Sequence, residues 1–237
     1  MYHLTNKSRG CVIRPADFLI TQIKMILYKF KTLNKFEQIS DLLMTGRFYC
    51  PTPRELNDPL EGILGISLLA DGGAETGEEG FSRAARFWFA SDEELAHYRL
   101  CTFSGRPDSI LMWSYYGKGH SGICIEADVS EYEAMVEKVT YVNDLSSIDQ
   151  KSVTDRMRYK LDCWAHENEY RVILGKDPAN KYIKPIIKTV LVGGNIDSNY
   201  IRPLFKLCQI MRYPIEAVSF STTGEFARLP LNNTYPW

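Results

Sequence analysis

The residues from 149 to 174 change from a helical pattern to a strand pattern, and this change constrains the fold more than any other stretch of the sequence. Apolar residues recur from Val153 to Trp164 at intervals of four, four and three, which is typical of one face of a helix. Branched and aromatic residues follow from Glu169 to Leu174, which predicts a strand. A helix over residues 149–164 is therefore expected, with a strand starting at Glu169.

Strand and helix patterns also alternate along the rest of the chain. Strands are predicted near residues 25–30, 100–104, 123–128, 139–142, 184–192 and 217–221, and helices near residues 34–46, 81–98, 108–116, 130–136 and 197–211. The βαβ rhythm of a parallel sheet, about 30 residues a unit, does not recur. The pattern predicts a single α+β domain over residues 25–221, with a mixed or mainly antiparallel sheet and flanking helices. Residues 1–24 are predicted to be an N-terminal extension and residues 222–237 a C-terminal tail.

Composition narrows the class of protein. The 237 residues carry a formal net charge of −1, so bulk affinity for nucleic acid is not expected, although a local basic groove is compatible with that total. No apolar run approaches the roughly 20 residues that a membrane helix needs. The six cysteines show neither C-x-x-C spacing nor a Cys/His cluster with zinc-ligand spacing. We therefore expect reduced thiols and a cytoplasmic protein, with no membrane partner and no metal ligands assigned.

Glu167 and Glu169 are candidates for acid–base chemistry. Residues two apart in an extended chain share one face. Two nearby carboxylates repel each other, which raises the pKa of one of them and places an acid and a base together. The alternative is structural: Glu169 pairs with Arg171 on the same face, and Glu167 is solvated.

A glycine-rich turn around His120 is the second candidate. Glycines let the backbone approach a ligand closely, and a neutral imidazole can act as a base. Trp113 and Tyr116 precede the turn, and their rings could stack on a base or a nicotinamide. The alternative is a loop histidine bonded to a carbonyl group, with the aromatic rings in the core.

The third candidate is an Asn-Asp-Pro turn. Asn57, Asp58 and Glu61 could bind a cation or a ribose, or could simply form the turn.

The sequence contains no Walker motif, no G-x-G-x-x-G, no G-x-S-x-G and no H-E-x-x-H. Common nucleotide kinases, Rossmann dehydrogenases, serine hydrolases and zincins are therefore excluded.

Five short motifs follow one another between Met25 and Phe220. They are Leu27-Tyr-Lys-Phe30, Asn57-Asp-Pro-x-Glu61, Met112-Trp-Ser-x-Tyr116, His120-x-Gly122-x-Cys-Ile and Lys160-x-x-x-Trp164-x-x-Glu167-x-Glu169-Tyr-Arg171. In order and spacing they resemble the signature of a widespread bacterial domain-of-unknown-function family. The resemblance implies no activity, but it implies that nine residues of these motifs form one site: Asn57, Asp58, Glu61, Trp113, Tyr116, His120, Glu167, Glu169 and Arg171.

Three segments also resemble the strand motifs of arginine-specific mono-ADP-ribosyltransferases, in the same order. They are a basic residue on an early strand (Lys29 or Lys31), Thr102-Phe-Ser104, and Glu167-x-Glu169 before an apolar strand. The early basic residue is Lys here and Arg in that family, and Thr-Phe-Ser is only part of the second motif. The resemblance implies that NAD is the co-substrate. It also implies that Glu169 stabilises positive charge on the ribose, that Glu167 takes a proton from the acceptor, that Lys29 contacts the pyrophosphate, and that Tyr116 or Trp113 stacks on a ring.

Three hypotheses about function follow. The first is an NAD-consuming transferase or glycohydrolase in a bacterial defence or toxin context, with a small nucleotide-type ligand and an acceptor that the sequence does not name. It predicts that Glu169→Gln keeps the stability of the protein and abolishes turnover. The second is a divalent-metal-dependent hydrolase or nuclease that uses His120, Asp58, Glu61 and Glu167. The third is a non-catalytic sensor or interaction module whose motifs are structural.

Overall fold

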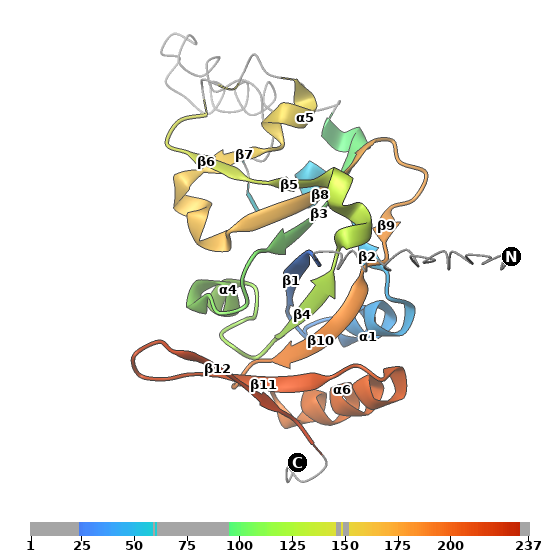
Figure 1. Ribbon diagram of the computed structural model, residues 1–237, viewed down its shortest axis with the longest axis vertical. Helices are drawn as coiled ribbons and strands as arrows, with labels where there is room; N and C mark the ends of the chain where they lie inside the picture. Colours follow the sequence, from blue (N-terminus) through green and yellow to red (C-terminus); the bar gives the residue numbers. More distant parts are fainter. Residues whose placement is uncertain (1–23, 59, 61–94, 146–147, 149–151, 233–237) are drawn as a thin grey trace, which may run out of the picture.

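The computed structural model describes residues 24–58, 60, 95–145, 148 and 152–232 (Figure 1). Three sequence predictions fall mainly on other residues: the N-terminal extension, Glu61 and the helix near residues 81–98. Residues 1–23, Glu61 and residues 81–94 lie outside the described residues. Of the segment 81–98 the structure describes η2 (Leu95–His97), a short 3-10 helix, and Tyr98, which begins a strand.

The described residues form a sheet of eight strands in the order β12-β11-β10-β4-β1-β3-β8-β5 (Figure 1). The strands are β1 (Ile26–Lys31), β3 (Tyr98–Ser104), β4 (Ile123–Asp128), β5 (Val136–Lys138), β8 (Glu169–Lys176), β10 (Ile186–Val192), β11 (Ile215–Phe220) and β12 (Phe226–Pro230). β10 and β11 run parallel, and every other neighbouring pair runs antiparallel. The predicted α+β class with a mainly antiparallel sheet is confirmed.

The remaining elements are short. Two small ladders join β2 (Phe48–Tyr49) to β9 (Tyr182–Ile183) and β6 (Thr140–Val142) to β7 (Tyr159–Leu161). The helices are α1 (Phe36–Thr45), α4 (Ile110–Tyr115), α5 (Val153–Arg156) and α6 (Ser198–Met211), and the further 3-10 turns include η1 (Pro53–Glu55), η3 (Ser130–Met135) and η5 (Asp162–Glu167).

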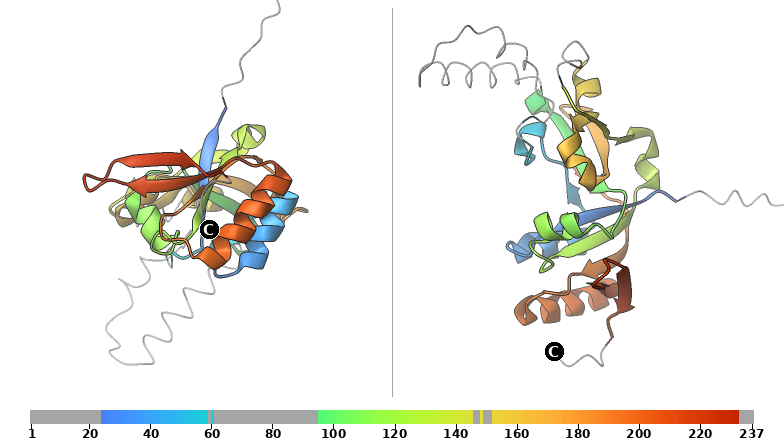
Figure 2. Two further views of the ribbon diagram at one scale, coloured as in Figure 1. Left: turned by 90° about the horizontal axis from the view of Figure 1, so that it is seen from below. Right: turned by 90° about the vertical axis from the view of Figure 1, so that its left-hand side faces the viewer.

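Helices α1 and α6 lie side by side and pack against one face of the sheet (Figures 1 and 2). Helix α1 ends at Thr45 and is capped by Gly46, which takes the left-handed conformation (φ 67°) and donates its N–H to the carbonyl of Leu42. Asp197 caps α6 by accepting the backbone N–H of Asn199. The buried residues of the two helices join the core: Ile39, Leu42, Leu43, Ile201, Leu204, Phe205 and Cys208.

The opposite face of the sheet carries a second core cluster. Side chains alternate along a strand, so Cys124 and Leu191 point away from the face covered by α1 and α6. Both pack with Trp113 of α4 and with Phe30 of β1. The short helix α4 thus lies against this second face and brings its last residues close to η5.

The sheet opens between β1 and β3. Their register has one bridging pair, Tyr28 with Ser104, whereas β1 shares six registered pairs with β4. Beyond that bridge the two strands diverge, and side chains fill the opening in place of a backbone ladder. This opening divides the sheet into two halves and positions the candidate site.

The helix predicted over residues 149–164 is wrong. The described part of this segment contains the four-residue helix α5, the strand β7 and the turn η5. β7 pairs in parallel with β6, so its backbone groups bond to a neighbouring strand and not along a helix. The apolar spacing that suggested a helix reflects burial of Val153 and Met157 in a small separate cluster.

The predicted C-terminal tail is also corrected in part. Phe226–Pro230 forms β12, which pairs antiparallel with β11 over five residues. Arg228 anchors this strand by donating to Glu216 at 2.6 Å and to Glu126 at 2.7 Å. The sheet therefore extends beyond residue 221, because the chain turns back after β11 and adds β12 as the edge strand.

Candidate functional site

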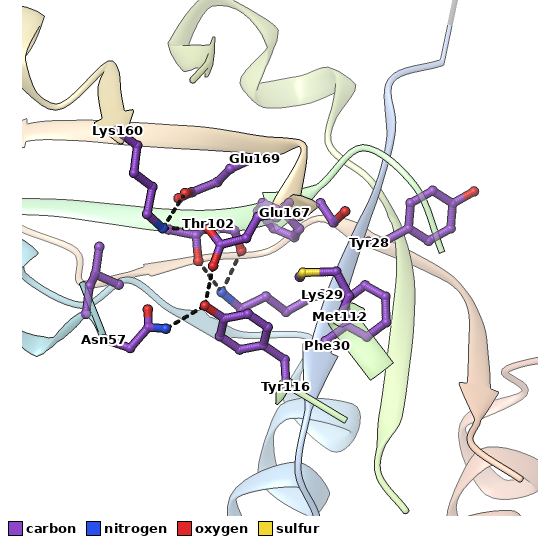
Figure 3. A pocket seen from close by; sticks show the side chains of 13 residues that line it. Tyr28, Lys29, Phe30, Asn57, Thr102, Met112, Tyr116, Lys160, Glu167 and Glu169 are labelled. Atoms are coloured by element: carbon purple, nitrogen blue, oxygen red, sulfur yellow. Dashed lines mark hydrogen bonds and ion pairs between the residues drawn. The ribbon is translucent and has the colours of Figure 1, made fainter. Parts of the chain in front are cut away.

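A pocket with a cavity volume of about 70 Å³ lies where β1 and β3 diverge (Figure 3). Its lining comes from β1, β3, α4, η5, β7, β8 and the residues after η1: Tyr28, Lys29, Phe30, Leu56, Asn57, Thr102, Phe103, Ser104, Met112, Tyr116, Lys160, Glu167 and Glu169. Apolar side chains form much of the wall, and five charged or amide side chains converge on the interior.

Glu167 and Glu169 both reach this pocket, from the end of η5 and the start of β8. Asn168 between them takes the left-handed conformation (φ 43°), which asparagine tolerates better than most residues. This turn changes the direction of the chain between the two carboxylates. Each glutamate is 4% exposed, so neither carboxylate is simply solvated.

Glu169 is held by two cations. Arg171 donates Nε to one carboxylate oxygen at 2.8 Å and Nη2 to the other at 3.0 Å, while Lys160 donates to the second oxygen at 3.2 Å. Burial acts to raise the pKa of Glu169, but Arg171 and Lys160 outweigh it and lower the pKa to about 2. Glu169 is therefore ionised at neutral pH, and its charge is already compensated.

Arg171 lies behind Glu169 and outside the pocket lining. Its side chain is fully buried, and its Nη1 donates to the carbonyl of Met157 at 2.6 Å. The sequence grouped Arg171 with ligand-binding residues. The structure corrects this assignment, because a fully buried side chain that serves Glu169 and Met157 does not reach a ligand.

Glu167 has a different environment. One of its oxygens accepts the hydroxyl of Tyr116, and the other accepts Nζ of Lys160 at 2.5 Å. Burial raises the pKa of Glu167 above its usual range, although Lys160 and Tyr116 act in the opposite direction. The two glutamates thus have pKa values shifted in opposite directions. The sequence predicted a raised pKa for one of them, from repulsion between the two carboxylates. The main cause for Glu167 is burial, with repulsion from Glu169 a smaller contribution.

Tyr116 connects Glu167 to the other side of the pocket. Its hydroxyl accepts Nδ2 of Asn57 at 2.5 Å and donates to Glu167 (Figure 3). Burial and the adjacent carboxylate raise the pKa of Tyr116, so the phenol keeps its proton. Asn57, Tyr116 and Glu167 form one hydrogen-bonded chain across three segments that are far apart in the sequence.

Lys160 is the residue that the sequence reasoning did not assign. It is 4% exposed, bridges the two glutamates and lies 4.6 Å from the centre of the Trp164 ring. Its apolar stem and its position in a predicted helix gave no sign of this role. The available signal was its place at the head of the motif that ends in Arg171.

Lys29 joins the two halves of the sheet. Its Nζ donates to the carbonyl of Thr102 at 2.5 Å and to the Thr102 hydroxyl at 3.0 Å, and it lies 5.6 Å from the centre of the Phe103 ring. These bonds replace part of the missing ladder between β1 and β3. An ammonium group has three donors, and these two hydrogen bonds engage two of them.

His120 and Trp113 are not among the lining residues. Trp113 is fully buried, donates Nε1 to the carbonyl of Pro107 at 2.7 Å and packs edge-on against Phe30. His120 stacks on Trp113 with an interplanar angle of 14° and meets Phe220 edge-on. Burial lowers the pKa of His120, which favours its neutral form. The predicted roles of these two rings in the site are therefore corrected: both belong to the aromatic cluster beside the pocket.

The other predicted site residues have mixed outcomes. Ser104 lines the pocket, but its hydroxyl donates to the carbonyl of Arg106 at 3.1 Å within its own turn. Asp58 is buried and accepts the backbone N–H of Leu60 at 2.9 Å, so it stabilises the turn and does not line the pocket. The sequence placed both in a single site, and only Ser104 lies there.

Two further properties concern the described residues alone. No three His, Cys, Asp or Glu side chains are grouped there in a way that could hold a metal ion. No helix there combines the length and apolar character needed to span a bilayer.

Comparisons of the chain with protein-family models, with curated proteins and with solved structures found no match.

Proposed function

We propose that the pocket binds the reacting end of an NAD-type nucleotide and breaks the bond between nicotinamide and ribose, as an ADP-ribosyltransferase-like transferase or glycohydrolase. The observation that carries the proposal is Glu167. It is a buried carboxylate that lines the opening between β1 and β3, and it is hydrogen-bonded to Tyr116 and Lys160.

The charges around the pocket suit an anionic nucleotide. Lys29 has no carboxylate partner among the described residues, and its nearest polar contacts are the neutral groups of Thr102. Arg171 and Lys160 balance the two glutamates, so the ammonium of Lys29 leaves an excess positive charge that favours a phosphate. Phe30, Phe103 and Met112 supply apolar wall for a ring.

One ionisable carboxylate is sufficient for the proposed chemistry. Nicotinamide in NAD is a cationic leaving group, so it departs as a neutral molecule with the bonding electron pair and needs no acid. Ionised Glu167 stabilises the positive charge that develops on the ribose in the transition state. Water or an acceptor then bonds to the ribose carbon, and its proton passes to Glu167.

This proposal moves the central role from Glu169 to Glu167. A carboxylate that already accepts two bonds from Arg171 and one from Lys160 has little charge left to offer a ligand. Glu169 instead keeps Lys160 next to Glu167. The ribose hydroxyls would then lie near Asn57 and Tyr116, which line the same wall.

A non-catalytic binding module is the second candidate. It is favoured by one observation: Glu167, Glu169, Lys160 and Arg171 satisfy one another, as a purely structural network would. The metal-dependent alternative has less support, because His120 and Asp58 do not share the pocket with Glu167, and Glu61 lies outside the described residues.

Release of nicotinamide from NAD tests the proposal. Wild-type protein and Glu167→Gln are incubated with NAD, alone and with candidate acceptors, and free nicotinamide is quantified by chromatography. Glu137→Gln is the matched control, because Glu137 pairs with Arg158 on the surface. We expect wild-type and control to release nicotinamide and Glu167→Gln to lose at least about 100-fold in rate, the usual effect of removing one preorganised charge. Wild-type protein that binds NAD without releasing nicotinamide supports the binding module.

A further inference from the structure

Two tyrosine side chains of the β2–β9 ribbon lie next to each other, with an arginine side chain over each of them. Tyr49 and Tyr182 are directly opposite each other in this ribbon, with ring centres 5.7 Å apart and an interplanar angle of 62°. The guanidinium of Arg47 lies over Tyr182 at 5.1 Å, and that of Arg99 lies over Tyr49 at 5.9 Å. We name Arg47, Tyr49, Arg99 and Tyr182 the β2–β9 face.

The rings of this face remain accessible. Tyr49 is 41% exposed and Tyr182 is 36% exposed, because each ring meets its neighbour at an edge and not in a closed stack. Arg47 is exposed as well. A planar ligand can therefore lie against either ring, next to the exposed Arg47.

The face is also cationic. Glu55 is the carboxylate that contacts it, pairing with Arg99 at 3.3 Å and accepting the Tyr49 hydroxyl at 3.0 Å. Arg47 forms no ion pair within the described residues, and the exposed Lys184 directly follows the end of β9. Positive charge therefore exceeds negative charge around the two rings, although the whole chain carries a net charge of −1.

We propose that the β2–β9 face binds single-stranded nucleic acid, with bases stacked on Tyr49 and Tyr182 and phosphates held by Arg47. Aromatic platforms between cationic side chains are the arrangement that binds single strands without sequence preference. Arginine suits both tasks, since its plane stacks on bases and its outer N–H groups pair with phosphate oxygens. An acidic peptide or a lipid headgroup would use the charges but would gain little from the rings.

The ribbon also leads towards the pocket. Glu55 ends η1, and the next two residues, Leu56 and Asn57, line the pocket. A strand bound on the face would thus pass close to the opening between β1 and β3. The proposal does not depend on NAD chemistry, and its test requires no turnover.

Fluorescence anisotropy with a labelled single-stranded oligonucleotide of mixed sequence tests the proposal on the full chain at low salt. Arg47→Ala removes a cation from the face, and Tyr182→Leu removes a ring while keeping apolar bulk. Lys206→Ala is the matched control, because Lys206 is an exposed cation on α6. Thermal melting of each variant verifies that it is folded.

We expect the wild-type protein to bind the single strand, and Arg47→Ala and Tyr182→Leu each to weaken binding by at least about fivefold. Lys206→Ala should change it less than twofold, and a duplex of the same sequence should bind much more weakly because its bases cannot stack. Undetectable binding by wild-type protein overturns the proposal. So does equal binding by Tyr182→Leu, or binding to vesicles rich in anionic lipid in preference to the oligonucleotide, since each outcome makes the rings irrelevant.

Discussion

Replacing Glu169 by glutamine should destabilise the protein strongly. Gln has nearly the same shape, but it has one acceptor oxygen where the carboxylate has two, and its amide group would face the donors of Arg171 or Lys160. Arg171 is fully buried and would lose the negative charge of Glu169 beside it. Sequence reasoning expected this variant to keep wild-type stability, and the structure reverses that expectation.

Two routes give similar magnitudes for this loss. Removing one partner of a buried ion pair usually costs about 3–5 kcal/mol, because the other charge stays buried without compensation. Independently, the pKa of Glu169 falls from 4.5 to about 2 on folding. At about 1.4 kcal/mol for each pH unit, ionised Glu169 contributes about 3 kcal/mol to folding at neutral pH.

Urea denaturation at pH 7 measures this loss directly. We expect Glu169→Gln to lower the free energy of unfolding by about 3 kcal/mol, which corresponds to a fall in Tm of about 6–12 °C for a domain of this size. Glu137→Gln serves as the control, because an exposed ion pair such as Glu137–Arg158 contributes about 1 kcal/mol or less. A Glu169→Gln variant within about 0.5 kcal/mol of wild type would refute the reasoning.

The pH dependence gives a second test of the same pair. The folded-state pKa of Glu169 is depressed, so its contribution is fully present above pH 4.5 and is lost as the pH falls towards 2. Wild-type protein should therefore lose about 3 kcal/mol more than Glu169→Gln over that interval. Parallel curves for the two proteins would show that Glu169 is not held as the structure indicates.

Two further substitutions test the surroundings of the site. Tyr116→Phe removes a donor that lowers the pKa of Glu167, so that pKa should rise and the acidic limb of any pH–rate profile should move to higher pH; an unmoved limb would mean that Glu167 does not govern the rate. Gly193→Ala places a Cβ atom 2.1 Å from the carbonyl oxygen of His120, and urea denaturation should show a loss of about 1–3 kcal/mol; an unchanged stability would refute the close approach.

The sequence predicted the fold class and most strands, because strand signals depend on local composition. Branched residues alternate with other residues in β4 and follow one another in β8, and both segments are strands of the sheet. The segment before Glu167 was mispredicted, since its apolar spacing fits a helix equally well. Part of this segment is the strand β7, because its backbone pairs with β6. Local periodicity in the sequence does not show such a pairing with a distant segment.

The candidate site was predicted in part for a similar reason. Glu167 and Glu169 were found because they are neighbours in the sequence, and their pairing with Arg171 was the structural alternative considered. His120 and Trp113 were placed in the site because glycine-rich turns often bind ligands. The sequence does not show which face of the sheet such a turn covers, and here it packs on the side of Phe220.

A crystal structure of the protein soaked with NAD or ADP-ribose tests the central claim most directly. The account predicts that the ribose lies in the opening between β1 and β3, with a hydroxyl or the reacting carbon next to the Glu167 carboxylate and a phosphate next to Lys29. A ligand bound elsewhere, or a Glu167 that keeps its bonds to Tyr116 and Lys160 while the opening stays empty at saturating ligand, would contradict it.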